Sequence, residues 1–432
     1  MLGTGASMND ERKVGIVGLG YVGLPLAVEF CNQGFDVYGV DKSSEKIELL
    51  QNGQTYIGDV PEATLKACLK TGRFHVSTDY DVLSKVQAVS VCVPTPLRKT
   101  KDPDMSYVVD AAENIAKILQ PGQVIILEST VYPGATEELI APILEKSGLT
   151  VGEDFYLAFS PERVDPGNKQ YGIRDIPKIV GGITEACTER AVELYQQVFK
   201  QVIPMKAREA EMAKLVENTF RAVNIGLINE LALVAHKMGI NIWNVIEAAK
   251  TKPFGFTAFY PGPGLGGHCI PIDPFYLSWK AKTYQADTSF IELAGKVNSQ
   301  MPAYVVERVA DLLNQVGKPF NGSKILILGV AYKRDVNDIR ESPALDIIGL
   351  LSKKGALVSF NDPYVPSFAY LERQWESQPL TEELLKEQDC VIVVTDHSDY
   401  DWEFIARHAK LIFDTRDATR QIQHQYKNIH LL

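Results

Sequence analysis

The sequence has few cysteines, no long apolar run and no excess of positive charge. Its six cysteines are scattered over 432 residues without a Cys-x-x-Cys pair, which argues against a disulfide framework or a zinc site and fits a reducing cytoplasm. No apolar run approaches the roughly 20 residues of a membrane helix, and the polar segment Met1–Asp10 lacks a signal-peptide core. The net charge of −10 argues against nucleic acid or an anionic membrane as a partner. The histidines show no metal spacing, so we expect a cytoplasmic protein without a metal site.

Length and composition indicate a globular protein of more than one domain. A chain of 432 residues is too long for one ordinary hydrophobic core, so two or three domains are expected. The hydrophobic fraction of 45% and the charged fraction of 23% are typical of globular proteins. The first residues, Met1–Ser7, are typical of an added leader, and we expect Met8 to be the native start.

One stretch, Pro261–Pro274, places glycines and prolines densely around Cys269, with Asp273 four residues later. Glycine lets the backbone approach a ligand closely, and proline keeps such a loop stiff. A thiol in such a loop is typical of a residue that takes part in a reaction. The alternative is a tight turn with a buried, inert cysteine, and this stretch alone does not separate the two interpretations.

A nucleotide-binding pattern opens the chain. The apolar strand Lys13–Val17 is followed at once by Gly18-Leu-Gly-Tyr-Val-Gly23 and then by a helix-like run, Leu24–Gln33. This is the dinucleotide fingerprint in its strand–turn–helix context. The three glycines make the tight turn, admit the pyrophosphate and let the helix pack on the strand, while the helix N-terminus favours phosphate. We therefore predict cofactor contacts at Gly18, Gly20, Tyr21, Val22 and Gly23.

The next predicted strand, Asp36–Val40, ends in Asp41. An acid at this point accepts a hydrogen bond from a ribose 2′-hydroxyl and repels a 2′-phosphate, so NAD is favoured over NADP. Lys42, beside it, weakens this preference slightly. The less favoured alternative is a glycine-rich turn in an α/β domain that binds no nucleotide.

Polar residues recur just past the carboxyl ends of three further predicted strands, where open parallel sheets bind their ligands. Each residue taken singly is as well explained by a helix cap or a turn, but the recurrence at one sheet edge favours function. The strands and the candidates that follow them are Ala88–Val93 with Thr95, Val124–Leu127 with Thr130, and Tyr156–Phe159 with Glu162.

A long helix is predicted over Arg208–Met238, where apolar residues recur at helical spacing and proline is absent. Lys214, Asn218 and Arg221 fall on one of its faces. From the residues alone, a solvated polar stripe is favoured; the alternative directs Lys214 and Asn218 into a cleft beside Cys269. The apolar face suits a dimer interface.

A shorter helical segment, Ile242–Lys250, leads into the thiol stretch. Behind that stretch, Tyr276-Leu-Ser-Trp-Lys280 matches the Tyr-x-x-x-Lys pair of short-chain dehydrogenases and epimerases. Those enzymes carry the pair on a helix inside a single Rossmann domain with a differently spaced glycine motif. We therefore interpret the match as a coincidence.

The α/β pattern restarts after a predicted helix, Pro302–Val316, but without a second Gly-x-Gly-x-x-Gly. Lys333, Arg340 and Arg416 follow strand ends and together suit a diphosphate, although any one alone is better explained as a surface cation. The predicted elements are the strands Lys324–Leu328, Leu357–Phe360, Cys390–Val394 and Leu411–Phe413, and the helix Ala344–Lys353.

These elements predict an α/β fold. Two Rossmann-like, doubly wound parallel-sheet domains are joined by a long central helix and a helical middle domain. We expect an NAD-binding domain at 11–203, a central helical and dimerisation domain with the cysteine loop at 204–301, and a domain for the nucleotide of the substrate at 302–432.

The thiol suggests a reaction of two oxidation steps. Oxidation of an alcohol to an aldehyde needs no thiol, whereas oxidation through the aldehyde to an acid can use one: a thiolate adds, a second hydride leaves, and the thioester is hydrolysed. Because the pKa of a thiol is about 8.5, the thiolate needs a cation or a helix dipole nearby. Lys214 could serve there and at the oxyanion, and Asp273 or Glu162 could position or activate water.

From Lys13 to the C-terminus the chain resembles the nucleotide-sugar 6-dehydrogenases, typified by UDP-glucose dehydrogenase. Many ordered motifs carry the resemblance, which makes it specific. They are Gly18-Leu-Gly-Tyr-Val-Gly-Leu-Pro25, Glu128-Ser-Thr-Val131, Ser160-Pro-Glu162, Lys214 with Asn218, Gly264-Leu-Gly-Gly-His-Cys269, Gly329-Val-Ala-Tyr-Lys333 and Arg340-Glu-Ser-Pro343.

The resemblance implies roles for the candidate residues. It makes Cys269 the nucleophile, gives Lys214 and Asp273 acid–base and oxyanion roles, and lets Thr130 and Glu162 position the water and the thioester. It thereby reverses the interpretation of the Lys214 face as a solvated stripe. The implied NAD contacts are Asp41, Thr95, Thr130 and Arg340. The implied UDP-sugar contacts are Glu162, Arg163, Lys214, Asn218, Arg221, Tyr260, Gly266, Lys333 and Arg416.

Departures from the pattern bear on the substrate. UDP-glucose enzymes usually have Gly-Gly-Ser-Cys-Phe-Pro-Lys-Asp at the thiol, whereas here His268 and Ile272 replace the serine and the lysine. This form, and the run Ser160-Pro-Glu-Arg-Val-Asp-Pro-Gly167, are similar to the branch that acts on UDP-N-acetylhexosamines. We therefore predict oxidation of UDP-N-acetylglucosamine to its uronic acid with two NAD, for a surface polysaccharide precursor, by a homodimer or higher homo-oligomer.

Other substrates and other classes of protein stay open. UDP-N-acetylgalactosamine, UDP-N-acetylmannosamine and UDP-glucose are alternative substrates for the same chemistry. A single-step dehydrogenase or an epimerase-type enzyme, with Cys269 structural, and a non-catalytic NAD-binding scaffold are the rivals from other classes. The number of NADH released per substrate separates them.

Overall fold

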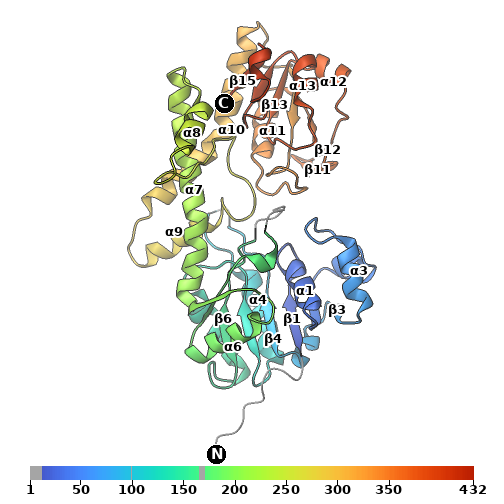
Figure 1. Cartoon of the computed structure of the whole chain (residues 1–432), viewed down its shortest axis with the longest axis vertical. Helices are drawn as coiled ribbons and strands as arrows, with labels where there is room; N and C mark the ends of the chain where they lie inside the picture. Colours follow the sequence, from blue (N-terminus) through green and yellow to red (C-terminus); the bar gives the residue numbers. More distant parts are fainter. Residues whose placement is uncertain (1–11, 99, 165–170) are drawn as a thin grey trace, which may run out of the picture. The chain divides into compact units, whose positions relative to one another are not determined.

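The computed structural model describes residues 12–98, 100–164 and 171–432. The expected leader Met1–Ser7 and Asp165–Gly167 of the substrate motif lie outside these residues. The chain divides into two compact units (Figure 1): residues up to 217 with 275–286, and residues 218–274 with 287–432. Among the described residues, no helix combines the length and the apolar character needed to cross a membrane.

The first unit is built on an eight-stranded sheet with the order β3-β2-β1-β4-β5-β6-β7-β8. Neighbours pair in parallel except β6 and β7, which are antiparallel. Strands such as β4 and β5 are buried at every position, as expected for parallel strands covered on both faces. The strands are β1 (Lys13–Val17), β2 (Asp36–Val40), β3 (Phe74–Ser77), β4 (Ala88–Val91), β5 (Val124–Leu127), β6 (Tyr156–Phe159), β7 (Lys178–Gly182) and β8 (Val202–Lys206).

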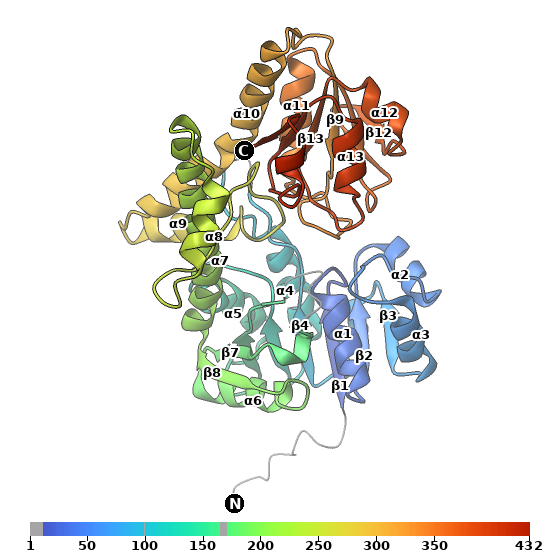
Figure 2. The ribbon, with the colours of Figure 1, turned by 45° about the horizontal axis from the view of Figure 1, so that its top comes forward.

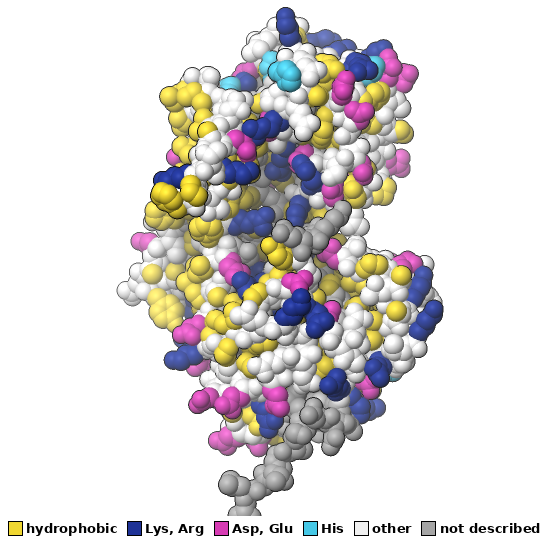
Figure 3. Space-filling model, viewed as in Figure 1, with side chains coloured by type: hydrophobic (Ala, Val, Ile, Leu, Met, Phe, Trp, Pro, Cys, Tyr) yellow, Lys and Arg dark blue, Asp and Glu magenta, His cyan; other side chains and the backbone are white. Residues whose placement is uncertain are grey.

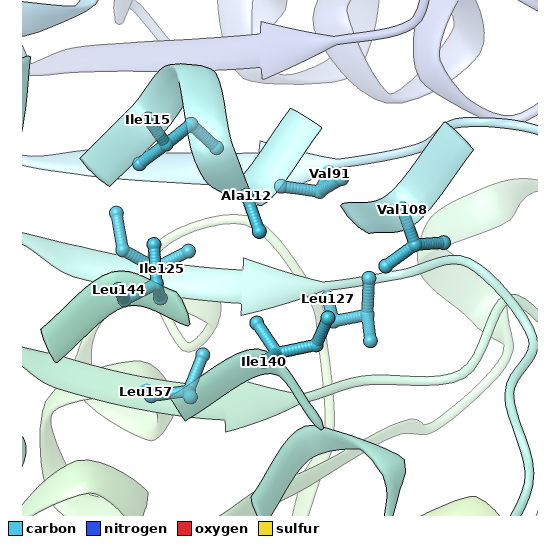
Figure 4. A pocket seen from close by; sticks show the side chains of 9 residues that line it. All are labelled: Val91, Val108, Ala112, Ile115, Ile125, Leu127, Ile140, Leu144 and Leu157. Carbon is cyan, nitrogen blue, oxygen red and sulfur yellow. The ribbon is translucent and has the colours of Figure 1, made fainter. Parts of the chain in front are cut away.

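Helices cover both faces of this sheet. Helices α1, α3 and α6 share one apolar cluster with β1, β4 and β5. Helices α4 and α5 lie over the other face, where a small void is lined only by apolar side chains (Figure 4). Without a polar group, this void is a gap in packing and not a binding site. The helices are α1 (Gly23–Asn32), α2 (Ser44–Gln51), α3 (Glu62–Lys70), α4 (Ser106–Ile118), α5 (Ala141–Leu144) and α6 (Glu185–Tyr195).

Two helices contribute residues to both units. Helix α7 (Ala207–Lys237) confirms the predicted long helix, and its residues from Asn218 on belong to the second unit. Helix α9 (Asp273–Thr283) begins at the end of the glycine- and proline-rich stretch around Cys269, which we call the thiol loop. The single glycine of α7, Gly226, allows close helix packing, because a Cβ there would lie 3.1 Å from the backbone of Ala294 on α10.

The helix α10 (Ser289–Gln315) corrects the prediction that a helix begins at Pro302. Proline usually ends or kinks a helix because it lacks an N–H, but Pro302 lies inside α10. The turns before it are held by burial, since Ile291, Ala294 and Met301 are all buried. Packing of this apolar face outweighs the one lost backbone hydrogen bond.

The second unit contains a five-stranded parallel sheet with the order β10-β9-β13-β14-β15 and a separate β11–β12 hairpin. Helices α10 and α11 cover one face of the sheet, and α12 and α13 cover the other (Figure 2). The strands are β9 (Lys324–Leu328), β10 (Leu357–Asn361), β11 (Ser367–Tyr370), β12 (Arg373–Glu376), β13 (Cys390–Val393), β14 (Ile412–Asp414) and β15 (Ile429–Leu431). The remaining helices are α8 (Ile242–Lys250), α11 (Pro343–Lys353), α12 (Glu382–Glu387) and α13 (Trp402–His408).

Candidate functional site

The glycine turn after β1 lies where the strand order reverses, between β1 and β4. Gly18 has a φ of +88°, and a Cβ there would lie 2.6 Å from the carbonyl oxygen of Cys92. A Cβ on Gly23 would lie 1.8 Å from the carbonyl oxygen of Gly18. By contrast, nothing lies within 4 Å of a Cβ built on Gly20. Two glycines are therefore required by the fold, while the third leaves room for a phosphate at the start of α1.

Asp41 anchors the glycine turn from the end of β2. Its carboxylate accepts hydrogen bonds from the backbone N–H groups of Leu19 (2.9 Å) and Ser43 (3.0 Å). Lys46 Nζ donates to the same carboxylate at 3.3 Å. A carboxylate held at this position fits the ribose of NAD, as the sequence predicts.

The residues after β4 and β5 lie at the same sheet edge. Thr95 is buried, and its carbonyl oxygen accepts a hydrogen bond from the Tyr276 hydroxyl at 2.9 Å. Ser129, just before Thr130, donates its hydroxyl to the carbonyl of Val93 at 2.7 Å. The Ser129 bond connects the two segments, and the Tyr276 bond connects the first of them to α9.

The Tyr-x-x-x-Lys match concerns two residues with structural contacts in this protein. Both side chains lie on α9 and have structural partners: Tyr276 bonds to the loop after β4, and Lys280 Nζ donates to Glu138 at 2.5 Å. The two residues hold α9 on the first unit, which is consistent with interpreting the match as a coincidence.

Glu162, Arg163 and Lys214 come together in the first unit. Lys214 Nζ donates to the carbonyl oxygen of Glu162 at 2.7 Å. The Glu162 carboxylate accepts the backbone N–H groups of Arg163 (2.7 Å) and Val164 (2.6 Å). Arg163 itself pairs with Glu217 on α7 at 2.7 Å. Lys214 is thus held on the segment that carries Glu162.

A buried group of charges lies beneath Glu162. Lys178 Nζ donates to Glu128 Oε2 at 2.6 Å and lies 3.9 Å from Glu162 Oε2. The hydroxyl of Tyr195 donates to the other oxygen of Glu128. Burial raises the pKa of Glu128, although Lys178 opposes this. Burial works to lower the pKa of Lys178, but the two carboxylates outweigh it and raise the pKa.

In the second unit, Cys269 lies just before the turn that leads into α9. Its carbonyl oxygen accepts hydrogen bonds from the N–H groups of Asp273 (2.8 Å) and Ile272 (3.1 Å), which form the turn into the helix. The positive end of a helix favours a thiolate. Asn218 Nδ2 donates to Asp273 Oδ2 at 2.5 Å, and Asp273 is buried. Cys269 is exposed, whereas the other five cysteines of the chain are buried.

The glycines of the thiol loop permit close contact with the C-terminal sheet domain. A Cβ on Gly267, whose φ is +84°, would lie 2.8 Å from the ring of Tyr332. A Cβ on Gly266 would lie 2.7 Å from the Cβ of Tyr332. The N–H of Gly267 donates to the carbonyl of Arg340 at 3.0 Å. Larger residues would therefore push the loop away from the segments after β9.

The candidate cations of the second unit differ in their surroundings. Arg416 donates from Nε to the carbonyl of Val394 at 2.8 Å, and burial lowers its pKa to about 10, so it stays charged at neutral pH. Arg340 forms a bidentate pair with Asp338, with Nη2 2.6 Å from Oδ2. Lys333 lies in the loop after β9.

The other two substrate candidates, Arg221 and Tyr260, come from other segments of the sequence than these cations. Arg221 is exposed on α7. The Tyr260 hydroxyl donates to Glu247 on α8 at 2.6 Å, and its ring stacks on Trp243 with centroids 5.9 Å apart. The structure therefore ties Tyr260 to α8.

Comparison with known proteins agrees with this architecture. Three family models match in order: the NAD-binding domain of the UDP-glucose/GDP-mannose dehydrogenase family over residues 12–199, its central domain over 208–300 and its UDP-binding domain over 326–421. Together they span most of the chain. The chain belongs to the UDP-glucose/GDP-mannose dehydrogenase family.

Relatives of this dehydrogenase cover nearly its whole length. The UDP-N-acetyl-D-mannosamine dehydrogenase of Pyrococcus horikoshii is 36% identical over 418 residues, which are 95% of this chain and 96% of that protein. The UDP-N-acetyl-D-glucosamine 6-dehydrogenase of Salmonella typhi is 36% identical over 395 residues, 90% of this chain and 91% of that protein. A structure of the P. horikoshii UDP-D-ManNAc dehydrogenase superposes with a TM-score of 0.86 at 34% identity, over 97% of this chain and 98% of that chain.

The family confirms the predicted fold class, the NAD cofactor and the assignment as an NAD-dependent nucleotide-sugar dehydrogenase. The glycine turn and Asp41 fit that cofactor, and they belong to the domain that the NAD-binding family model matches. Among the described residues, no three His, Cys, Asp or Glu side chains cluster in a way that could hold a metal ion.

Sequence reasoning missed the buried groups of this enzyme. Lys178 and Tyr195 carry no motif, and nothing in the sequence signals that Lys178 meets Glu128 of the Glu-Ser-Thr-Val motif. Two further buried groups, the Asn229–Asn298 pair between α7 and α10 and the imidazole of His397, were also not predicted.

Proposed function

We propose that this dehydrogenase oxidises carbon 6 of UDP-N-acetylglucosamine to the carboxylate, reducing two NAD per substrate. The observation that carries the proposal is Cys269, an exposed thiol whose carbonyl oxygen accepts the N–H of Asp273, the residue that pairs with Asn218. Such a thiol suits a covalent intermediate better than a structural role, because structural cysteines are usually buried.

In the first oxidation, the C6 hydroxyl loses its proton to a base and a hydride from the same carbon, giving an aldehyde. Bound NAD supplies the hydride acceptor in both oxidations. The Cys269 thiolate then adds to the aldehyde carbon. The resulting thiohemiacetal loses the second hydride and becomes a thioester, which water hydrolyses to the acid while the thiolate leaves.

The remaining side chains receive roles from their contacts within each unit. Asp273 and Lys214 exchange the protons of the hydroxyl, the oxyanion and the attacking water. Asn218 holds Asp273 through its 2.5 Å hydrogen bond. Glu162 and Thr130 orient the water and the thioester.

The other proposed contacts divide between the cofactor and the substrate. Besides the glycine turn, Asp41, Thr95, Thr130 and Arg340 contact NAD. The candidate contacts to the UDP-sugar are Glu162, Arg163, Lys214, Asn218, Arg221, Tyr260, Gly266, Lys333 and Arg416.

The thiol motif supports an N-acetylhexosamine substrate. His268 replaces the serine of the UDP-glucose enzymes, and burial together with Arg340 lowers the pKa of His268, which keeps its ring neutral near pH 7. A neutral imidazole can both donate and accept a hydrogen bond, as an acetamido group requires. UDP-N-acetylmannosamine is the second candidate, because the P. horikoshii relative is named for it.

The test is a substrate screen with NADH counted per UDP-sugar. UDP-N-acetylglucosamine is compared with its C2 epimer, its C4 epimer and UDP-glucose. Two NADH per substrate are expected for the preferred sugar, and one NADH would contradict the thioester route. Cys269→Ser should lose turnover while it still binds UDP, whereas Cys390→Ser, at a buried thiol, should keep the stoichiometry of two.

We also propose that the enzyme is a cytoplasmic homodimer formed through the apolar face of α7. Phe220, Leu227 and Leu231 are 55%, 52% and 42% exposed on this helix. Figure 3 shows hydrophobic side chains on the surface over α8 and the end of α7. Apolar area that is exposed on one face of a helix in the single chain is typical of a surface that becomes buried when two proteins associate. Leu227→Glu with Leu231→Glu should give a monomer in light scattering, whereas Glu230→Lys should stay dimeric.

A further inference from the structure

His397 is buried in the C-terminal sheet domain, although the proposed chemistry assigns it no role. It follows β13, at the sheet edge where the loop after β9 also lies. An imidazole out of contact with water is costly unless both ring nitrogens are hydrogen-bonded. The partners of these nitrogens therefore show what the residue holds.

Both nitrogens bond to the backbone or side chain of neighbouring loops. Nδ1 accepts the backbone N–H of Asp335 at 3.0 Å, so it carries no proton. Nε2 therefore carries the proton and donates to Asp362 Oδ2 at 3.0 Å. The hydrogen bonds thus fix one neutral tautomer.

Asp362 extends this contact to the beginning of the same loop. Its Oδ2 also accepts the N–H groups of Val330 (2.7 Å) and Ala331 (3.0 Å). The imidazole therefore contacts both ends of the segment 330–335. It bonds directly to Asp335 at the end, and it reaches Val330 and Ala331 at the beginning through Asp362.

The end of this loop adopts an unfavourable backbone conformation. Asp335 has a φ of +59°, in the left-handed region that non-glycine residues rarely occupy. Its carboxylate accepts the backbone N–H and the hydroxyl of Ser398 at 2.8 and 2.6 Å. Such a conformation persists only when surrounding bonds hold it, and the His397 bond acts together with the two Ser398 bonds.

The loop 330–335 carries two residues that matter to the site. Lys333 is a proposed contact to the UDP diphosphate. Tyr332 is the residue against which Gly266 and Gly267 of the thiol loop lie. A shift of the loop would therefore displace a nucleotide contact and the support of the thiol loop together.

We propose that His397 is a positioning residue that fixes the loop 330–335 for binding of the UDP group and for support of the thiol loop. For Lys333 the inference rests on the proposed function. The geometry of the two ring nitrogens carries it: one neutral side chain joins both ends of the loop.

The first experiment measures binding of UDP and of NAD by calorimetry. His397→Ala is expected to lower the affinity for UDP at least about tenfold, because two buried hydrogen bonds are lost. The affinity for NAD should change less than about twofold. His397→Asn keeps an acceptor near Nδ1, and His397→Gln keeps a donor near Nε2, so each should lose less than the alanine variant. Leu385→Ala, at a buried core position on α12, is the control for destabilisation alone and should leave both affinities unchanged.

The second experiment follows hydrogen exchange of the Val330, Ala331 and Asp335 amides. All three should exchange at least about tenfold faster in His397→Ala than in Leu385→Ala, because the Asp335 amide loses its acceptor and Asp362, the acceptor of the other two, loses the imidazole that holds it. Wild-type exchange at these amides in His397→Ala would overturn the inference. If the alanine variant does not fold, the Asn and Gln variants decide: wild-type UDP affinity and wild-type exchange in both would overturn it.

The two readouts separate the inference from the proposed function. If the wild-type enzyme failed to bind UDP, the assignment of the nucleotide site would be wrong. Faster exchange at the three amides in the variants would still support the role of His397 in fixing the loop 330–335, and unchanged exchange would still overturn it.

Discussion

Replacement of Lys178 by methionine tests how the first unit tolerates its buried charges. Lys178 is buried together with its partner Glu128, with side-chain exposures of 5% and 0%. Methionine keeps an unbranched chain of similar length but removes the charge and the donor. The variant leaves the Glu128 carboxylate in the protein interior without a cation.

The magnitude follows from two competing terms. At the observed 2.6 Å, the attraction of the pair is about 6 kcal/mol with an effective dielectric constant of about 20. The variant does not lose this full amount, because Glu128 can escape by taking up a proton. Protonation of a carboxyl with a pKa of about 4.3 costs about 4 kcal/mol at pH 7, which sets the upper limit of the loss.

The protonation gives the loss a pH dependence of defined sign. The folded variant holds a proton on Glu128 that the unfolded chain releases above a pH of about 4.3, so the stability of the variant falls by about 1.4 kcal/mol per pH unit as the pH rises. The difference from wild type should therefore shrink from about 4 kcal/mol at pH 7 to about 2 kcal/mol at pH 5.5.

The assay is urea unfolding followed by loss of NAD binding, which reports on the first unit, at both pH values. Glu128→Gln combined with Lys178→Met should recover most of the stability, since replacing both members of a buried pair is often nearly neutral. Lys200→Met, which breaks an exposed pair with Asp175, is the control and should match wild type. An equal loss at pH 7 and pH 5.5, or a double variant as unstable as the single one, would refute the reasoning.

Four further predictions concern single positions. Gly267→Ala should lower kcat at least about tenfold with unchanged NAD affinity, because its φ of +84° and the nearby Tyr332 ring exclude a side chain; steady-state kinetics and an NAD titration check this. Asn218→Ala should lower kcat/KM for the UDP-sugar at least about tenfold by removing the donor to Asp273, and wild-type kinetics would contradict its role. Tyr276→Phe should cost about 1 kcal/mol in urea unfolding by removing its hydroxyl bonds to the loop after β4. Burial and Asp414 raise the pKa of Asp417 from 3.8 to about 6, so the folded state loses stability as the pH rises between these two values, and Asp417→Asn should raise the urea midpoint more at pH 8 than at pH 5.

Elements with strong local signals could be predicted from the sequence. The strand before Gly18 and the long helix α7 were predicted because strand, turn and helix periods are local properties of the chain. The start of α10 was predicted wrongly at Pro302, because the burial that holds the preceding turns depends on partners remote in sequence. The antiparallel entry of β7 into the first sheet carries no sequence signal either, since register and direction are set by packing.

The candidate site divides in the same way. Cys269 was found because glycines and prolines mark its loop. From the residues alone, Lys214 was placed on a solvated stripe, whereas its ammonium donates to the carbonyl of Glu162. That bond joins positions 52 residues apart, and no periodicity encodes it. Lys178 and His397 escaped notice for the same reason, because a buried polar group is recognised only by its partners.

The two sheet domains share one structural feature, a carboxylate after the second strand, but differ in how far it is exposed. In each, a carboxylate at the end of the second strand accepts an N–H from the turn after the first strand: Asp41 from Leu19, and Asp362 from Val330. Asp41 keeps 11% of its side chain exposed, so it can also accept from a ribose. Asp362 is fully buried and its oxygens accept four backbone N–H groups and the imidazole of His397. Because Asp362 is occupied in this way, we expect a nucleotide in the C-terminal domain to be bound by other groups, and the proposed ones are the cations after β9 and β14.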